Sequence, residues 1–99
     1  MTPEATADRI AAAVTALPAV AGLHGGRFGE VVTLGIAHRV PGVRVGEEAV
    51  TVAVTARFPL VAGELAEAVR VAAGIGDRPV HVVVADLALP EETAVKEKD

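Results

Sequence analysis

Three histidines, His24, His38 and His81, are the side chains best suited to acid–base chemistry or metal binding near neutral pH. No two of them stand four residues apart, which is the spacing of two metal ligands on one face of a helix. The chain has no cysteine and no serine, which removes thiolate ligands and the nucleophiles of cysteine and serine enzymes. We therefore expect structural or surface histidines, no bound metal and no cofactor.

Two pairs of adjacent glutamates, Glu47-Glu48 and Glu91-Glu92, could in principle supply a general acid and a general base. Carboxylates in such roles are usually buried or placed beside a charge that shifts their pKa. Here the first pair falls in an expected turn and the second in a charged tail, where water should surround both. The sequence therefore predicts that the protein is not an enzyme.

The segment from Gly22 to Gly29 contains four glycines and one arginine, Arg27. Phosphate-binding loops place such glycines between a strand and a following helix, whereas here a helix is expected before them and a strand after them. Gly26-Arg27-Phe28-Gly29 also matches GxxG, the loop with which KH domains hold RNA, but in those domains the loop joins two helices. Because the GxxG match stands, we keep KH-like nucleic-acid binding through Arg27 and neighbouring arginines as the alternative hypothesis. We favour a flexible turn that lets Phe28 pack against the protein.

The charge of the chain also argues against nucleic acid and anionic lipid as partners. Thirteen acidic and nine basic residues give a net charge of −4. Residues 1–89 contain nine of the acids and seven arginines, while both lysines lie in the last ten residues. A chain with this net negative charge does not attract phosphate groups at long range.

The apolar residues are unusually small. They make up 52% of the 99 residues, yet 20 are alanine, 18 are valine, and Phe28 and Phe58 are the only aromatics. The longest apolar run, from Ile10 to Leu23, is too short to span a bilayer, and no basic segment precedes it as in a signal peptide. We expect a cytoplasmic protein that does not insert directly into a membrane, with a core of small and β-branched side chains.

Hydrophobic periodicity and turn residues predict two helices and several strands. Thr2 and Pro3 are a typical helix start, and Pro18 ends that helix near residue 17. In the clearest strand, Ala49 to Phe58, alternate residues face the core, and Phe58 should be one of the few large side chains there. The other expected elements are a strand at 31–37 with Val32, Leu34 and Ile36 on one face, a break at 39–42, a strand at 43–45 forming a hairpin with 49–58, a helix at 62–73 and a strand at 80–87.

This order of helix, strands, helix and strand predicts an α+β fold. The economical architecture is a two-layer sandwich, with two helices on one face of a small mixed sheet of three to four strands. Residues 1–89 should form this single domain, and residues 90–99 a charged, disordered tail.

The last strand is apolar on both faces, which two helices on one face of the sheet cannot cover. Val80, Val82 and Val84 should face the helices. The opposite row, Val83, Ala85, Leu87 and Leu89, should then be an exposed interface that forms a homo-oligomer, most simply a two-fold dimer. The alternative is that the tail or the 39–45 segment folds over this row.

Several segments resemble the alkaline-shock-protein family of bacterial envelope stress response proteins. Pro18–Leu23, after an amphipathic helix, is similar to the family's PGVAxL element. Arg39–Val45 followed by Ala49–Val54 resembles its GVxV…VxVxV hairpin. The helix that carries Leu65, followed by Arg78–Leu87, resembles its closing helix and VxVxVxxV strand.

The resemblance covers about residues 5–89 and rests mostly on hydrophobic patterns. The 25–30 and 39–45 segments look like the short versions found in GC-rich Gram-positive bacteria. Ala19 stands where the family usually has glycine, Pro59-Leu60 replaces the usual glycine after the long strand, and the long charged tails of larger members are missing.

The resemblance implies a non-enzymatic scaffold protein of cell-envelope stress response or homeostasis. Some members of the family self-assemble and associate with the membrane through an anchored partner. By analogy, the partners of this chain would be further copies of itself and a membrane-anchored protein of the same family type. The family has no agreed catalytic residues, so the resemblance assigns none here.

Overall fold

Local signals in the sequence set the limits of both helices. The computed structural model describes residues 2–36 and 38–89. Helix α1 (Pro3–Thr15) begins where the Thr2 hydroxyl accepts a hydrogen bond from the Ala5 N–H at 3.0 Å, and it ends two residues earlier than expected. Helix α2 (Ala62–Ala73) ends at Gly74, whose positive φ of 62° suits glycine.

The central strand of the sheet is β5 (Val50–Arg57), as its long alternation predicts. On one side it pairs antiparallel with β1 (Val20–Leu23) and β4 (Val43–Val45), which lie along different halves of β5. On the other side it pairs in parallel with β6 (Val80–Ala88) over its whole length. The mixed four-stranded sheet and the β4–β5 hairpin are therefore confirmed.

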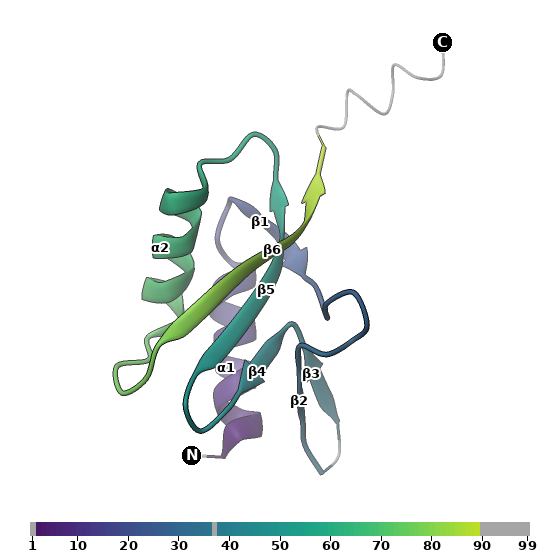
Figure 1. The fold of residues 1–99 in the computed structure, drawn as a ribbon, viewed down its shortest axis with the longest axis vertical. Coiled ribbons are helices and arrows are strands. Elements are labelled where there is room, and N and C mark those ends of the chain that lie inside the picture. The colour runs from purple at the N-terminus through teal and green to yellow at the C-terminus, as the bar shows by residue number, and fades with distance from the viewer. Residues whose placement is uncertain (1, 37, 90–99) are drawn as a thin grey trace.

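The two helices and the sheet form the two layers of the α+β fold (Figure 1). Helix α1 packs against α2 and β4, and α2 packs against β6. One face of β5 contributes Val50, Val52, Val54 and Ala56 to the core. The helices add to this core from one side, with Ala7, Ile10 and Val14 from α1 and Leu65, Val69 and Ala73 from α2. In the described part of the chain no helix has the length and hydrophobicity needed to cross a bilayer.

The region from Val31 to Pro41 differs from the prediction. Instead of one strand and a break, it forms a small separate hairpin of β2 (Val32–Leu34) and β3 (Arg39–Pro41). Pro41 is tolerated because it lies at the end of an edge strand. The predicted buried face is also wrong: Thr33 is buried, whereas Leu34 and Ile36 are 73% and 101% exposed.

Phe58, which the sequence places in the core, lies partly at the surface. Phe58 is 49% exposed because β5 ends at Arg57, and the alternation of the strand does not continue into the Phe58-Pro59 turn. Val61 is also exposed, at 60%, because it precedes α2 as its N-cap residue. The tail predicted for residues 90–99 lies outside the described residues.

Candidate interaction surface on the last strand

Strand β6 is an edge strand of nine residues. Among the described residues β5 is the only strand that pairs with β6, so the backbone groups on the far side of β6 face away from the sheet. Unpaired strand edges of this length are templates for pairing with another chain, and proteins usually shorten, charge or cover them. The β6 edge is therefore the first candidate for an interaction surface.

The outer edge of β4, on the opposite side of β5 from β6, is covered by one buried side chain. The Thr33 hydroxyl donates a hydrogen bond to the Val43 carbonyl at 2.6 Å and accepts one from the Val45 N–H at 3.1 Å. These two groups lie on the edge of β4 that faces away from β5, so Thr33 joins the β2–β3 hairpin to this edge. Within the described residues the β4 edge is therefore covered, whereas no strand pairs with the outer side of β6.

The backbone groups of β6 that point outward can be named from the ladder. The Val50 N–H donates to the Pro79 carbonyl, and Val50 pairs with Val80. Bonding groups alternate along a parallel strand, so Val82 and Val84 direct their N–H and C=O groups away from β5.

The two ends of this edge are occupied by side chains. The Arg70 Nε donates to the Val80 carbonyl at 3.1 Å, and the Leu87 N–H donates to the Asp86 carboxylate at 2.9 Å. The open part of the edge is therefore the stretch of Val82 and Val84, between an arginine and an aspartate.

The four residues predicted as an interface do not share one face. The ladder shifts register after Val84, so Val83 lies opposite Ala53 on the outer face, whereas Leu87 lies opposite Ala56 on the core side. Ala85 is the residue that the shift leaves without a partner in β5, as in a β-bulge. All the same, Val83 and Leu87 are 43% and 44% exposed, and Leu89, beyond the end of β6, is 62% exposed.

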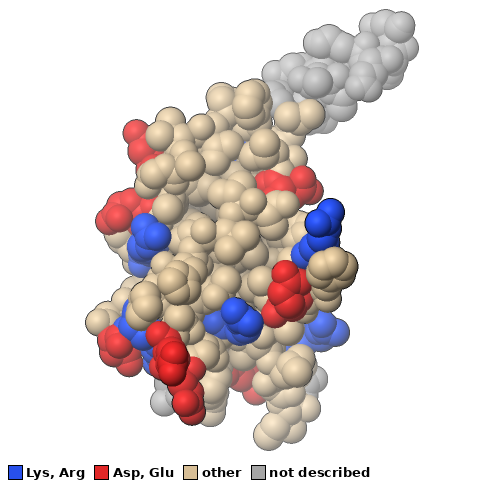
Figure 2. Space-filling model, in the orientation of Figure 1, with Lys and Arg blue, Asp and Glu red and all other residues tan. Residues whose placement is uncertain are grey.

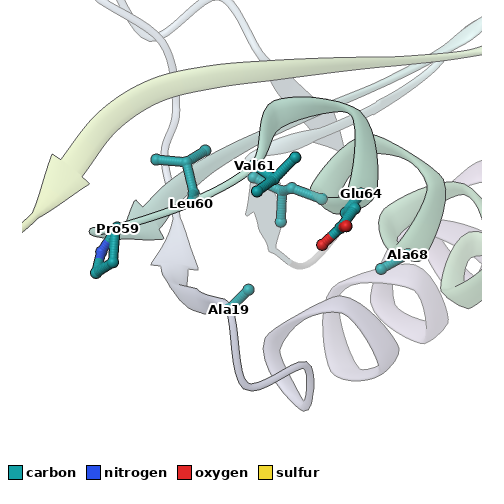
Figure 3. A pocket seen from close by; sticks show the side chains of 7 residues that line it. Ala19, Pro59, Leu60, Val61, Glu64 and Ala68 are labelled. Atoms are coloured by element: carbon teal, nitrogen blue, oxygen red, sulfur yellow. The ribbon is translucent and has the colours of Figure 1, made fainter.

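The apolar surface continues from β6 toward the start of α2. Figure 2 shows few charged side chains over the middle and upper part of this view, and most of the charge lies along the margins and the lower part. A hollow of about 440 Å³ opens between α2, the Pro59–Val61 segment and Ala19, with Glu64 as its one charged lining residue (Figure 3). A neighbouring hollow of about 580 Å³ shares Leu60 and reaches Val84 and Leu87.

The glycine-rich loop is held in place by its own hydrogen bonds. His24 Nδ1 accepts from the Gly26 N–H at 3.0 Å, and Glu30 Oε1 accepts from the Phe28 N–H at 2.9 Å. Gly26 has a φ of 91°, and a Cβ there would lie 2.7 Å from the Glu30 carboxyl carbon. The expectation that Phe28 packs is wrong, because the loop turns its side chain outward and leaves it 86% exposed.

Arg27 lies in this loop between β1 and β2. The loop does not join two helices, as expected from the sequence. Its guanidinium lies 6.0 Å from the centroid of the Phe28 ring, and it lines a hollow of about 620 Å³ together with the Glu30 carboxylate and Val83. Four of the other arginines donate to backbone carbonyls within the fold, namely Arg9, Arg57, Arg70 and Arg78. These hydrogen bonds give most of the arginines a structural role. They do not support the RNA-binding alternative.

We expect the loop around Glu30 to lose order as the pH falls. Hydrogen bonds from the backbone N–H groups of Glu30 itself and of Phe28, followed by the charge of Arg44, hold the pKa of Glu30 below its ordinary value. A lowered pKa means that the ionised carboxylate stabilises the folded loop above the ordinary Glu value, and this stabilisation disappears as the pH falls through the lowered pKa.

An NMR titration that follows the Glu30 side chain and the Phe28 amide tests this expectation. The Phe28 amide shift should titrate with Glu30, and this dependence should vanish in Glu30→Gln, which can still accept the hydrogen bond but does not ionise. A Glu30 pKa at or above the ordinary value would contradict the described loop geometry.

Sequence reasoning missed a small charged cluster that anchors the β2–β3 hairpin. His38 Nδ1 lies 2.8 Å from Glu4 Oε2, and His38 Nε2 lies 3.2 Å from Asp8 Oδ2. Glu4 and Asp8 share one face of α1, a spacing that the sequence does show, but their approach to His38 depends on the fold. In residues 2–36 and 38–89 no group of His, Asp or Glu is arranged to hold a metal ion.

The chain matches no family model, no curated protein and no solved structure. The similarity to the alkaline-shock-protein family therefore remains the resemblance of segments described above.

Proposed function

We propose that this chain is a non-enzymatic interaction or scaffold protein of the cell-envelope stress response or of envelope homeostasis. It acts in the cytoplasm through self-association and through a membrane-anchored partner of the same family type. The observation that carries the proposal is the open edge of β6, with Val83, Val84 and Leu87 partly exposed beside it. An unpaired strand edge beside exposed apolar side chains is a template for pairing with another chain and is characteristic of a surface that binds protein.

The resemblance supplies the biological setting of this proposal, and the structure supplies a surface that would serve it. The segments that resemble the family include Arg78–Leu87, which contains most of β6. The same strand therefore carries both the family pattern and the unpaired edge. Self-association through β6 also agrees with the family's tendency to self-assemble.

Static light scattering over a range of protein concentrations tests the self-association. We expect a mass that rises from monomer toward dimer, and we expect Val83→Glu to return it to monomer, because the variant places a charge on the partly exposed face of the edge strand. Ile36→Glu is the matched control, since it introduces the same charge at a fully exposed apolar residue in the hairpin between β2 and β3. This control should keep the mass of the parent.

Two results would contradict the proposal. The first is a strict monomer at high concentration. The second is a shift of a mixed RNA pool that weakens steeply with added salt and disappears in Arg27→Glu, because phosphate contacts release counterions and make binding depend on salt. That result would favour the KH-like alternative, whereas we expect no RNA shift at any salt concentration.

A further inference from the structure

We infer that two copies of this chain pair through their β6 edges, antiparallel, about a two-fold axis that passes at Val83. The two sheets would then become one continuous sheet. This inference rests on the proposed self-association and adds the partner, the surface and the register.

The register follows from which backbone groups are free. Val82 and Val84 point their N–H and C=O groups outward, while Arg70 occupies the Val80 carbonyl and Asp86 occupies the Leu87 N–H. With the axis at Val83, Val82 of one copy lies opposite Val84 of the other, and all of these free groups bond across the interface. An axis at Val82 would instead set Val84 opposite Val80 and displace Arg70.

The charges at the two ends of the edge support the same arrangement. Arg70 lies at the beginning of the open edge and Asp86 at its end. An antiparallel two-fold pair brings the Arg70 end of one copy beside the Asp86 end of the other, twice in each dimer. Opposite charges near an interface favour this pairing over a parallel one, which would bring like charges together.

A second copy is also the partner that best matches the side chains. At the axis Val83 of one copy would meet Val83 of the other as a non-hydrogen-bonded pair, in which facing side chains come closest. Val83 is 43% exposed and Val84 is 40% exposed in the single chain, so both have apolar surface left to bury. The edge is thus self-complementary in hydrogen bonding, charge and apolar side chains.

The absence of cysteine from the sequence allows a direct test by cross-linking. In the inferred register the two Val83 Cα atoms lie about 4.5 Å apart, within the range that a disulfide spans. Val83→Cys should therefore form a disulfide-linked dimer in most chains under mild oxidation. His81→Cys, two residues away on the same face of the same strand, should remain monomeric on a denaturing gel, because the two His81 positions would lie more than about 10 Å apart.

A further variant tests the backbone hydrogen bonds of the inferred interface. Val84→Pro removes an N–H that points away from β5, so it leaves the β5–β6 ladder intact and takes away a bond at the interface. We expect this variant to unfold cooperatively and to be monomeric by light scattering. If it does not fold, the cysteine pair still decides the question.

The outcomes separate this inference from the broader proposal. A parent protein that dimerises, with no disulfide in Val83→Cys or with equal cross-linking in His81→Cys, overturns the β6 register and leaves self-association standing. A parent that is monomeric at every concentration overturns both, and the edge would then be left for an extended segment of a different protein. A disulfide in Val83→Cys alone supports the inferred pair.

Discussion

Ile10→Ala should lower the free energy of unfolding by about 2–5 kcal/mol, the range for removing a large aliphatic side chain from a packed core. Ile10 is fully buried on α1 and is among the largest completely buried side chains of the described chain. Its neighbours in the core are mostly valine and alanine, which are too short to fill the space that it would leave. Chemical denaturation at neutral pH measures the change.

Phe58→Ala is the informative comparison for this variant. Strand alternation alone ranks Phe58 as a large core residue, but its side chain is half exposed beyond the end of β5. Less apolar surface is lost when a half-exposed side chain is removed, so its cost should be clearly smaller than that of Ile10→Ala. A larger loss for Phe58→Ala than for Ile10→Ala would show that the core is placed wrongly.

Thr33→Val should lower the free energy of unfolding by about 1–3 kcal/mol, the cost of leaving buried hydrogen-bonding groups without a partner. The substitution keeps the shape of the side chain but removes the hydroxyl that serves both the Val43 carbonyl and the Val45 N–H. The loss should be measured by thermal or chemical unfolding. It should be accompanied by faster amide exchange at Val45, whose N–H would lose its acceptor.

Thr33→Ser is the matched control, because it keeps the hydroxyl and loses only a methyl group. It should retain the slow exchange of the Val45 amide. Equal exchange rates in the two variants would mean that the hydroxyl does not hold the β4 edge, and the contrast drawn between the two edges of the sheet would fail.

The outer edges of β4 and β6 differ in how their backbone groups are satisfied. Thr33 satisfies the β4 edge from within the chain, at the cost of burying a polar residue in an otherwise apolar environment. At the β6 edge, Arg70 and Asp86 occupy only the two ends. The N–H and C=O groups of Val82 and Val84, between these ends, are left for a partner. The proposed assembly therefore forms at the β6 edge and not at the β4 edge.

Features that depend on neighbours along the chain follow from the amino-acid sequence alone. Thr2 and Pro3 start α1, Gly74 ends α2, and the alternation from Val50 onward specifies β5 and its buried face. Capping bonds and side-chain periodicity are set within a few residues, so they can be read without knowing what packs against the segment.

Which partner each short segment meets depends on how distant parts of the chain pack together in the fold. Thr33 is buried and Leu34 exposed because β2 faces the edge of β4, which no local pattern in Val31–Ile36 reveals. The shift after Val84 separates Val83 from Leu87 because β6 must follow the register of β5 along its whole length. Burial and register are properties of pairs of segments far apart in the chain, and hydrophobic alternation in one segment cannot specify them.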